Sequence, residues 1–264
     1  MNGKFYKFFL IGFLLSVSAQ LSFTQTAKTK PFDVGEALTY EGKFSKIIKG
    51  IGVADLSLKI ERAADGRNYL IKSEARSKGS LLKLFRFSFF QQFSSVIDAD
   101  RFRILKTVKR DAQGDRVRDS EAVFDYADRR VTYVETDPRD PVRPPRKIAS
   151  EITDDTHDLI SAIYSLRLLP LAVGRSFDVY ISDSGLLYKI PVRVTAREQQ
   201  KSILGRMWCF RIEPEIFGVN RLIEKEGDIT IWITDDARRL PVRAQINSDI
   251  GRVEVKLKTA SGIN

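Results

Sequence analysis

The sequence predicts a mainly β fold: a single curved antiparallel sheet, forming a half-barrel or open barrel, with one buried or covering helix. Three observations support this prediction. Apolar and polar residues alternate in run after run, short polar turns separate the runs, and only one segment has apolar residues at helical spacing. Because strands and helices do not alternate along the chain, we expect antiparallel connections between neighbouring strands.

The composition restricts the function classes. The chain has 264 residues, of which 30% are charged and 43% hydrophobic, so we expect neither a disordered polar chain nor a membrane protein with several spans. Its single cysteine excludes an internal disulfide. With only one histidine as well, zinc and iron–sulfur clusters are excluded, and we expect no metal and no other cofactor.

The first nineteen residues have the features of a secretory signal peptide. Lys4 and Lys7 precede an apolar run that is shorter than a membrane-spanning helix and ends in small residues up to Ala19. We expect cleavage after Ala19 and a periplasmic mature protein. The expected organisation is a signal peptide at 1–19, a flexible leader at 20–30 and a single β-rich domain at 31–260.

The strands are predicted from alternation with a period of two. Residues 54–60 alternate, Asp65-Gly66 provides a turn, and Tyr69 begins the next strand, so this segment is a β-hairpin. Further alternating runs lie at 102–104, 122–126, 190–194, 229–233, 240–246 and 253–257. Turn sequences lie at 113–115, 128–130, 235–237 and 247–251.

The densest apolar segment, residues 81–93, does not alternate. Four of its five phenylalanines (Phe85, Phe87, Phe89 and Phe93) lie at odd positions, and apolar residues of the other parity, such as Phe90, lie between them. Two interpretations remain open. The segment is either a core strand covered on both faces or a lid at the rim of an apolar cavity.

One helix is predicted over about 155–168, where apolar residues recur at helical spacing. Asp154 or Asp155 can cap its first turn, and Pro170 ends it. The proline-rich stretch 137–145 is expected to be an exposed loop that joins the first block of strands to this helix, because prolines do not fit in a strand ladder.

No group of residues indicates catalysis. Nothing in the spacing pairs Cys209 with His157, so a buried inert thiol is the simpler interpretation. The acidic residues around His157 are explained by helix capping, and Asp235 and Asp236 by a solvated turn. We therefore expect a protein that is not an enzyme.

The basic residues have two possible roles. Arg238, Arg239 and Arg243 are candidates for an anion-binding patch, and so are five residues elsewhere in the sequence: Arg101, Arg103, Lys106, Lys109 and Arg110. Alternatively, they form the solvated face of an alternating sheet. Export excludes nucleic acid as a partner, which leaves lipids, lipopolysaccharide and wall polymers as the anions of the envelope.

Several segments resemble a known family in the same order. They are PFDVGEALTY at 31–40, the helix and following turn at 158–174, ILGRMWC at 203–209, and IWITDDARRLPVR at 231–243. Together they are similar to the exported domain-of-unknown-function family 3108 of Gram-negative bacteria, from about residue 32 to 258. That family has no established activity, so the resemblance implies no catalytic residues.

A fainter resemblance concerns the last strands. The turn at 235–236, Leu240-Pro241 and the turn at 249–251 are similar to the closing hairpins of periplasmic lipoprotein-carrier (LolA-like) and RseB-like half-barrels. This resemblance implies a curved sheet, covered by helices, that binds acyl chains on an apolar concave face.

The function expected from these observations is a non-catalytic periplasmic envelope protein that binds a lipid or another amphipathic anion on the concave face of the sheet. The candidate ligand-binding residues are Phe85, Phe87, Phe89, Phe93, Trp208, Arg238, Arg239 and Arg243. An alternative is a structural module that contacts a wall polymer or an envelope protein. In either case we expect the protein to be peripheral to the membrane at most.

Overall fold

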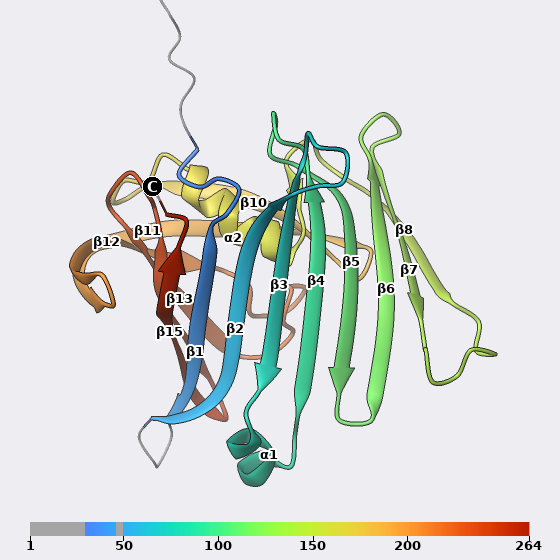
Figure 1. Cartoon of the computed structure of the whole chain (residues 1–264), viewed down its shortest axis with the longest axis horizontal. Coiled ribbons are helices and arrows are strands. Elements are labelled where there is room, and N and C mark those ends of the chain that lie inside the picture. Colours follow the sequence, from blue (N-terminus) through green and yellow to red (C-terminus); the bar gives the residue numbers. More distant parts are fainter. Residues whose placement is uncertain (1–29, 46–49, 264) are drawn as a thin grey trace, which may run out of the picture.

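The computed structural model describes residues 30–45 and 50–263, so the expected signal peptide and nearly all of the expected leader lie outside the described residues. Within the described part of the chain, fifteen strands form a single curved sheet that does not close into a barrel, and there are two helices (Figure 1). The mainly β, open curved fold expected from the sequence is confirmed.

The strands follow one another around the sheet. The first block contains β1 (Ala37–Ser45), β2 (Ile51–Arg62), β3 (Tyr69–Ser77), β4 (Phe89–Ile97), β5 (Ile104–Gln113), β6 (Arg116–Asp125), β7 (Arg130–Thr136) and β8 (Arg146–Glu151). The second contains β9 (Thr156–His157), β10 (Ser176–Asp183), β11 (Leu186–Ser202), β12 (Gly205–Pro214), β13 (Gly227–Thr234), β14 (Pro241–Ser248) and β15 (Gly251–Ser261). The helices are α1 (Gly79–Phe85) and α2 (Leu159–Leu168).

The two blocks are joined in the middle of the sheet by the antiparallel pair of β1 and β15, so β8 and β9 are its two ends. Among the fifteen described strands, only β9 and β10 pair in parallel. The curvature brings the β10–β11 turn against β7 and β8. A Cβ atom on Gly185 in this turn would lie 2.7 Å from Cβ of Tyr133 and 2.9 Å from Cβ of Ile148. We call this contact, which involves no strand pairing, the seam.

The concave face has two halves. Its upper half, at the end where Figure 1 places α2, contains the buried residues Ile60, Ile71 and Ile97 on neighbouring strands. Helix α2 packs there with Ile160 and Tyr164 buried in the same core. The lower half, toward α1, contains Leu56, Ala75 and Gln91 further along the same strands. The helix predicted from the sequence therefore covers only part of the concave face.

An ion pair buried in the core anchors α2. Arg167, in its last turn, donates hydrogen bonds of 2.6 and 2.8 Å to the two carboxylate oxygens of Glu36, and both side chains are 1% exposed. The same guanidinium donates to the carbonyls of Pro31 and Arg238. Such a bidentate arrangement satisfies most of the buried donors, so the pair holds α2, the start of the sheet and the β13–β14 turn together.

The start of α2 differs from the sequence prediction. The helix begins at Leu159, and its cap is Asp158 instead of Asp154 or Asp155. The Asp158 carboxylate accepts a 2.7 Å hydrogen bond from the Ser161 backbone N–H, and the Ser161 hydroxyl reciprocates as a capping box. Residues 156–157 are extended because they pair with β10 as strand β9.

Three further sequence predictions need correction. The segment 81–93 is not one continuous strand: α1 occupies its start, Arg86 ends the helix in the left-handed region with φ 51°, and the strand begins at Phe89. The loop 137–145 joins β7 to β8 and not to the helix. Phe102 lies in a turn with φ 53°, so β5 starts at Ile104 and not at 102.

Candidate ligand-binding site

The lower half of the concave face contains an apolar cleft of about 330 Å³. Leu159 and Ile163 of α2 line one end of this cleft, which we call the interior cleft. Its walls come from the two sides of the sheet. The lining residues are Tyr40, Leu56, Leu58, Ser73, Ala75, Gln91 and Phe93 from the first block, and Ile229, Ile231, Pro241, Arg243, Ala244, Ile246 and Val255 from the second. Its size and largely apolar walls are typical of sites for small organic ligands.

A second apolar hollow of about 180 Å³ continues along α2. It shares Leu159, Ile163, Ile229 and Ile231 with the interior cleft. Its other walls are Val and Ile side chains of β10 and β11, together with Leu222. The two hollows therefore meet at Leu159 and Ile163 of α2 and form one continuous apolar surface.

Lys109 lies beside the interior cleft and has no carboxylate partner among the described residues. Its ammonium lies 5.1 Å from the ring centroid of Phe93, which lines the cleft. It also lines a small hollow with Thr107, Ser120 and Leu159. A half-buried cation of this kind, held over an aromatic ring beside hydroxyl groups, can bind an anion without first breaking an ion pair.

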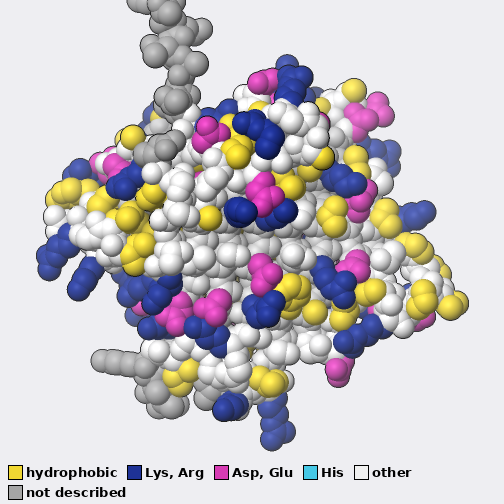
Figure 2. Space-filling view, in the orientation of Figure 1, with side chains coloured by type: hydrophobic (Ala, Val, Ile, Leu, Met, Phe, Trp, Pro, Cys, Tyr) yellow, Lys and Arg dark blue, Asp and Glu magenta, His cyan; other side chains and the backbone are white. Residues whose placement is uncertain are grey.

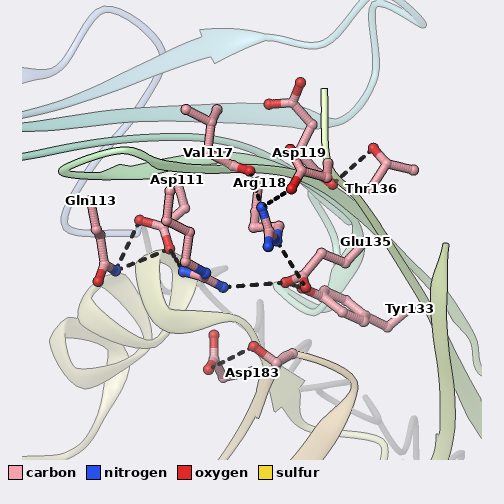
Figure 3. A network of polar contacts seen from close by, with 12 residues as sticks. Asp111, Gln113, Val117, Arg118, Asp119, Tyr133, Glu135, Thr136 and Asp183 are labelled. Atoms are coloured by element: carbon pink, nitrogen blue, oxygen red, sulfur yellow. Dashed lines mark hydrogen bonds and ion pairs between the residues drawn. The ribbon is translucent and has the colours of Figure 1, made fainter. Parts of the chain in front are cut away.

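A network of paired charges lies beyond Lys109 on the same face (Figure 3). Arg116 connects Asp111, at 3.3 Å, with Glu135, at 3.9 Å. Arg118 lies 2.5 Å from Asp137 and 3.9 Å from Glu135. Because each of these arginines already faces carboxylates, the network makes the lower rim polar without leaving a free positive charge.

The aromatic candidates from the sequence are spread over different places. Phe93 is buried and lines the interior cleft. Phe85 and Phe87 are exposed at and just after α1, and Phe89 is half-buried at the start of β4. Trp208 lies elsewhere, 46% exposed, with the Arg197 guanidinium 4.5 Å from its ring centroid.

The arginine candidates all have acidic partners. Arg238 donates to Asp236 at 2.6 Å, and Arg239 lies 3.6 Å from Asp235, so both are paired within the β13–β14 turn. Arg243 lines the interior cleft and pairs with Glu254 at 2.6 Å. Only Phe93 and Arg243 of the candidate set are therefore brought together at the cleft.

Lys109 could be separated from its neighbours by the period of the strand. It lies on the opposite face of β5 from Lys106 and Arg110, which pair with Glu121 and Asp119, respectively. Alternation therefore distinguishes Lys109 from these two residues of the basic group. It does not reveal which of the two faces is concave, so the sequence alone does not show that Lys109, and not Lys106 or Arg110, faces the cleft.

The polar residues considered for catalysis are not assembled into a reactive group. Cys209 is fully buried, and burial raises the pKa of its thiol to about 12. Burial lowers the pKa of His157 to about 4, and its ring lies against Phe102. Within residues 30–45 and 50–263, no group of three or more His, Cys, Asp or Glu side chains is arranged to hold a metal ion.

A polar hollow of about 570 Å³ lies at β11–β14 and the loop after β12. Its arginines are paired: Arg193 and Arg221 with Glu215, and Arg211 with Glu213. It offers neither the apolar surface nor the unpaired charge found at the interior cleft. Among residues 30–45 and 50–263, no helix has the length and apolar character needed to span a bilayer.

Comparison with solved structures identifies the fold. A β-barrel-like protein of the domain-of-unknown-function family 1849 from Brucella abortus superposes with a TM-score of 0.54 at 10% identity, over 85% of this chain and 96% of that one. A protein of the domain-of-unknown-function family 1089 from Pseudomonas aeruginosa gives a TM-score of 0.33 at 11% identity, over 84% and 96% of the two chains. No curated protein is significantly similar.

The sequence profile of the DUF3108 family matches residues 38–258, which include every residue that lines the interior cleft. This match supports the resemblance noted in the sequence, whereas the superposed structures do not single out the lipoprotein-carrier half-barrels. The chain belongs to the DUF3108 family of proteins of unknown function.

Proposed function

We propose that this protein binds an amphipathic anionic molecule, such as a lipid with one negatively charged group, on the concave face of its sheet. The observation that supports the proposal most directly is the interior cleft, a largely apolar hollow of about 330 Å³ beside α2. An alkyl chain in the cleft gains about 0.8 kcal/mol for each methylene group removed from water. The adjoining hollow of about 180 Å³ extends the surface available to it.

Lys109 is the proposed partner of the anionic group. Its ammonium stands over Phe93, whose ring lines the cleft, so a chain lying against Phe93 places its polar end near this cation. The paired arginines Arg116 and Arg118 are the less favourable choice, because an incoming anion would compete with the carboxylates that they already contact.

The proposed location is the periplasm, since the charged, apolar and small-residue segments of a signal peptide occupy positions 1–19 of the sequence. The protein acts there by non-covalent binding and not by catalysis. Its ligands are then the lipids and lipid-like anions of the cell envelope.

Native mass spectrometry of the full chain, purified from a Gram-negative host without detergent, tests the proposal. We expect adduct masses whose fragments identify a lipid. Ala75→Phe fills the cleft and is expected to remove the adducts, whereas Ala149→Phe, at an exposed position on β8, is expected to keep them. A wild type that is purified without ligand and also fails to bind a fluorescent fatty acid contradicts the proposal.

A competition experiment tests the role of Lys109. Palmitate and hexadecanol share an alkyl chain and differ in charge. Lys109→Gln is expected to weaken palmitate binding about tenfold and to leave hexadecanol binding nearly unchanged, because only the carboxylate loses a charged partner. Lys106→Gln, on the same strand but paired with Glu121, is the matched control. Equal loss for both competitors would contradict the assignment.

A further inference from the structure

The tip that joins β3 to β4 exposes apolar side chains. Leu82 and Phe85 of α1, and Phe87 just after it, are 52%, 42% and 41% exposed. They are held in place at their inner side: the Phe85 ring packs edge-on against Phe44 at 5.0 Å, and Phe87 lies 6.3 Å from Phe89. Three neighbouring apolar side chains are therefore presented to the outside by a short, well-anchored helix. We call residues 79–87 the α1 tip.

The α1 tip also has uncompensated positive charge. Lys83 and Arg86 are exposed and have no carboxylate partner among the described residues, whereas Lys78, just before the helix, pairs with Glu41 and Asp55. In Figure 2, basic and hydrophobic side chains lie at the lower end of the molecule, where Figure 1 places α1. Apolar and cationic groups thus alternate along one exposed segment.

The position of the α1 tip relates it to the interior cleft. The tip connects the two strands that provide Ala75 and Gln91 to the cleft wall. The Ser80 hydroxyl donates to the carbonyl of Gly52 on β2, the strand that provides Leu56. The exposed apolar groups therefore lie at the end of the concave face that α2 leaves uncovered.

We propose that the α1 tip docks the protein on the surface of an anionic lipid bilayer. Aromatic and leucine side chains insert at the bilayer interface, and adjacent Lys and Arg side chains are attracted to anionic headgroups. The charges of Lys83 and Arg86 favour such a surface over an apolar protein partner. The patch is also small compared with a stable protein interface, which buries at least about 1,200 Å².

Vesicle flotation with the purified full chain tests this proposal. We expect binding to vesicles of phosphatidylethanolamine and phosphatidylglycerol, and binding at least about tenfold weaker to vesicles of phosphatidylcholine alone. The double variant Phe85→Ser/Phe87→Ser is expected to lose binding to both. Lys83→Gln/Arg86→Gln is expected to lose the preference for anionic vesicles, and added salt should weaken wild-type binding.

The β11–β12 hairpin provides the matched control, because Ile203, 49% exposed, lies there between the exposed Lys201 and Arg206. Ile203→Ser/Arg206→Gln is expected to float like the wild type. Phe87→Trp gives a second measurement: its emission should shift to the blue with anionic vesicles. Circular dichroism checks that each variant is folded.

Two results would overturn the proposal. One is a wild type that does not float with anionic vesicles, which would leave a protein as the partner of this surface. The other is an α1-tip variant that floats as well as the wild type. Ala75→Phe separates this proposal from the ligand-binding one, because filling the cleft should leave vesicle binding unchanged.

Discussion

The upper and lower halves of the concave face are built from the same strands, yet only the upper half is filled. Helix α2 has ten residues and is about 15 Å long, whereas β2 has twelve residues and is about 40 Å long. A helix of that length cannot cover the strands in any orientation. The interior cleft therefore results from a mismatch in length between the sheet and the helix that packs on it.

The ion pairs of the two halves also differ in their exposure to solvent. In the upper half, Glu36 and Arg167 are withdrawn from solvent and satisfy each other. In the lower half, Asp111 is buried, whereas the side chain of its partner Arg116 is 47% exposed. Separating the Glu36–Arg167 pair of the upper half therefore leaves a buried charge without a partner, whereas Arg116 of the lower half can exchange its carboxylate for water.

The largest expected effect comes from breaking the buried ion pair. Glu36→Gln leaves the Arg167 charge buried without a carboxylate, and we expect the free energy of unfolding to fall by about 3–5 kcal/mol. Urea unfolding followed by circular dichroism measures it. Glu74→Gln, which removes an exposed partner of Arg76, is the control and should cost less than about 1 kcal/mol. Similar decreases in the free energy of unfolding for the two variants would mean that the buried pair stabilises the fold no more than an exposed one.

A smaller effect is expected from the packing difference between the halves. Ile71→Ala, at a fully buried position, should lower the free energy of unfolding by about 2–5 kcal/mol. Ile246→Ala, at a half-buried position on the cleft wall, should cost about 1 kcal/mol, because fewer atoms lose contacts. Equal costs from denaturant titration would mean that the lower half is packed as closely as the upper half.

An effect of comparable size depends on pH. Burial lowers the pKa of His157 from 6.5 to about 4, so the folded protein favours the neutral ring. Between these two pH values the unfolded chain binds the extra proton, and the contribution of His157 to stability is lost as the pH falls. The loss is on the order of 3 kcal/mol. His157→Gln should remove this part of the pH dependence between pH 7 and 4; parallel curves for the two proteins would contradict it.

The strands could be predicted because alternation is a local property. Leu56 and Leu58 repeat with the period of a strand whatever the rest of the chain does. The α1 tip was missed for the opposite reason: its apolar residues at consecutive positions give no period, and Gly79 and the left-handed Arg86 set the helix ends. The predicted start of α2 was wrong because residues 156–157 pair with β10 as strand β9, and this contact between distant segments leaves no local pattern in the sequence.

The candidate site could be predicted only in part, for a geometric reason. Phe93 was found because it belongs to a conspicuous aromatic run, whereas Ala75 and Ile163 have no local property that marks a cleft wall. Their role depends on which face is concave and on where α2 stops. Arg238 and Arg239 were selected for their charge, but the turn that brings Asp235 and Asp236 beside them pairs that charge.

The seam at Gly185 has a consequence for the width of the molecule. Around the rest of the curve, neighbouring strands are fixed at hydrogen-bonding distance from one another, but the β10–β11 turn meets Tyr133 and Ile148 through packing. The circumference of the curled sheet is therefore not set by a closed ring of hydrogen bonds. Opening the curled sheet at the seam would cost side-chain contacts, among them the polar contact of Tyr133 with Ser184, and would leave every strand paired.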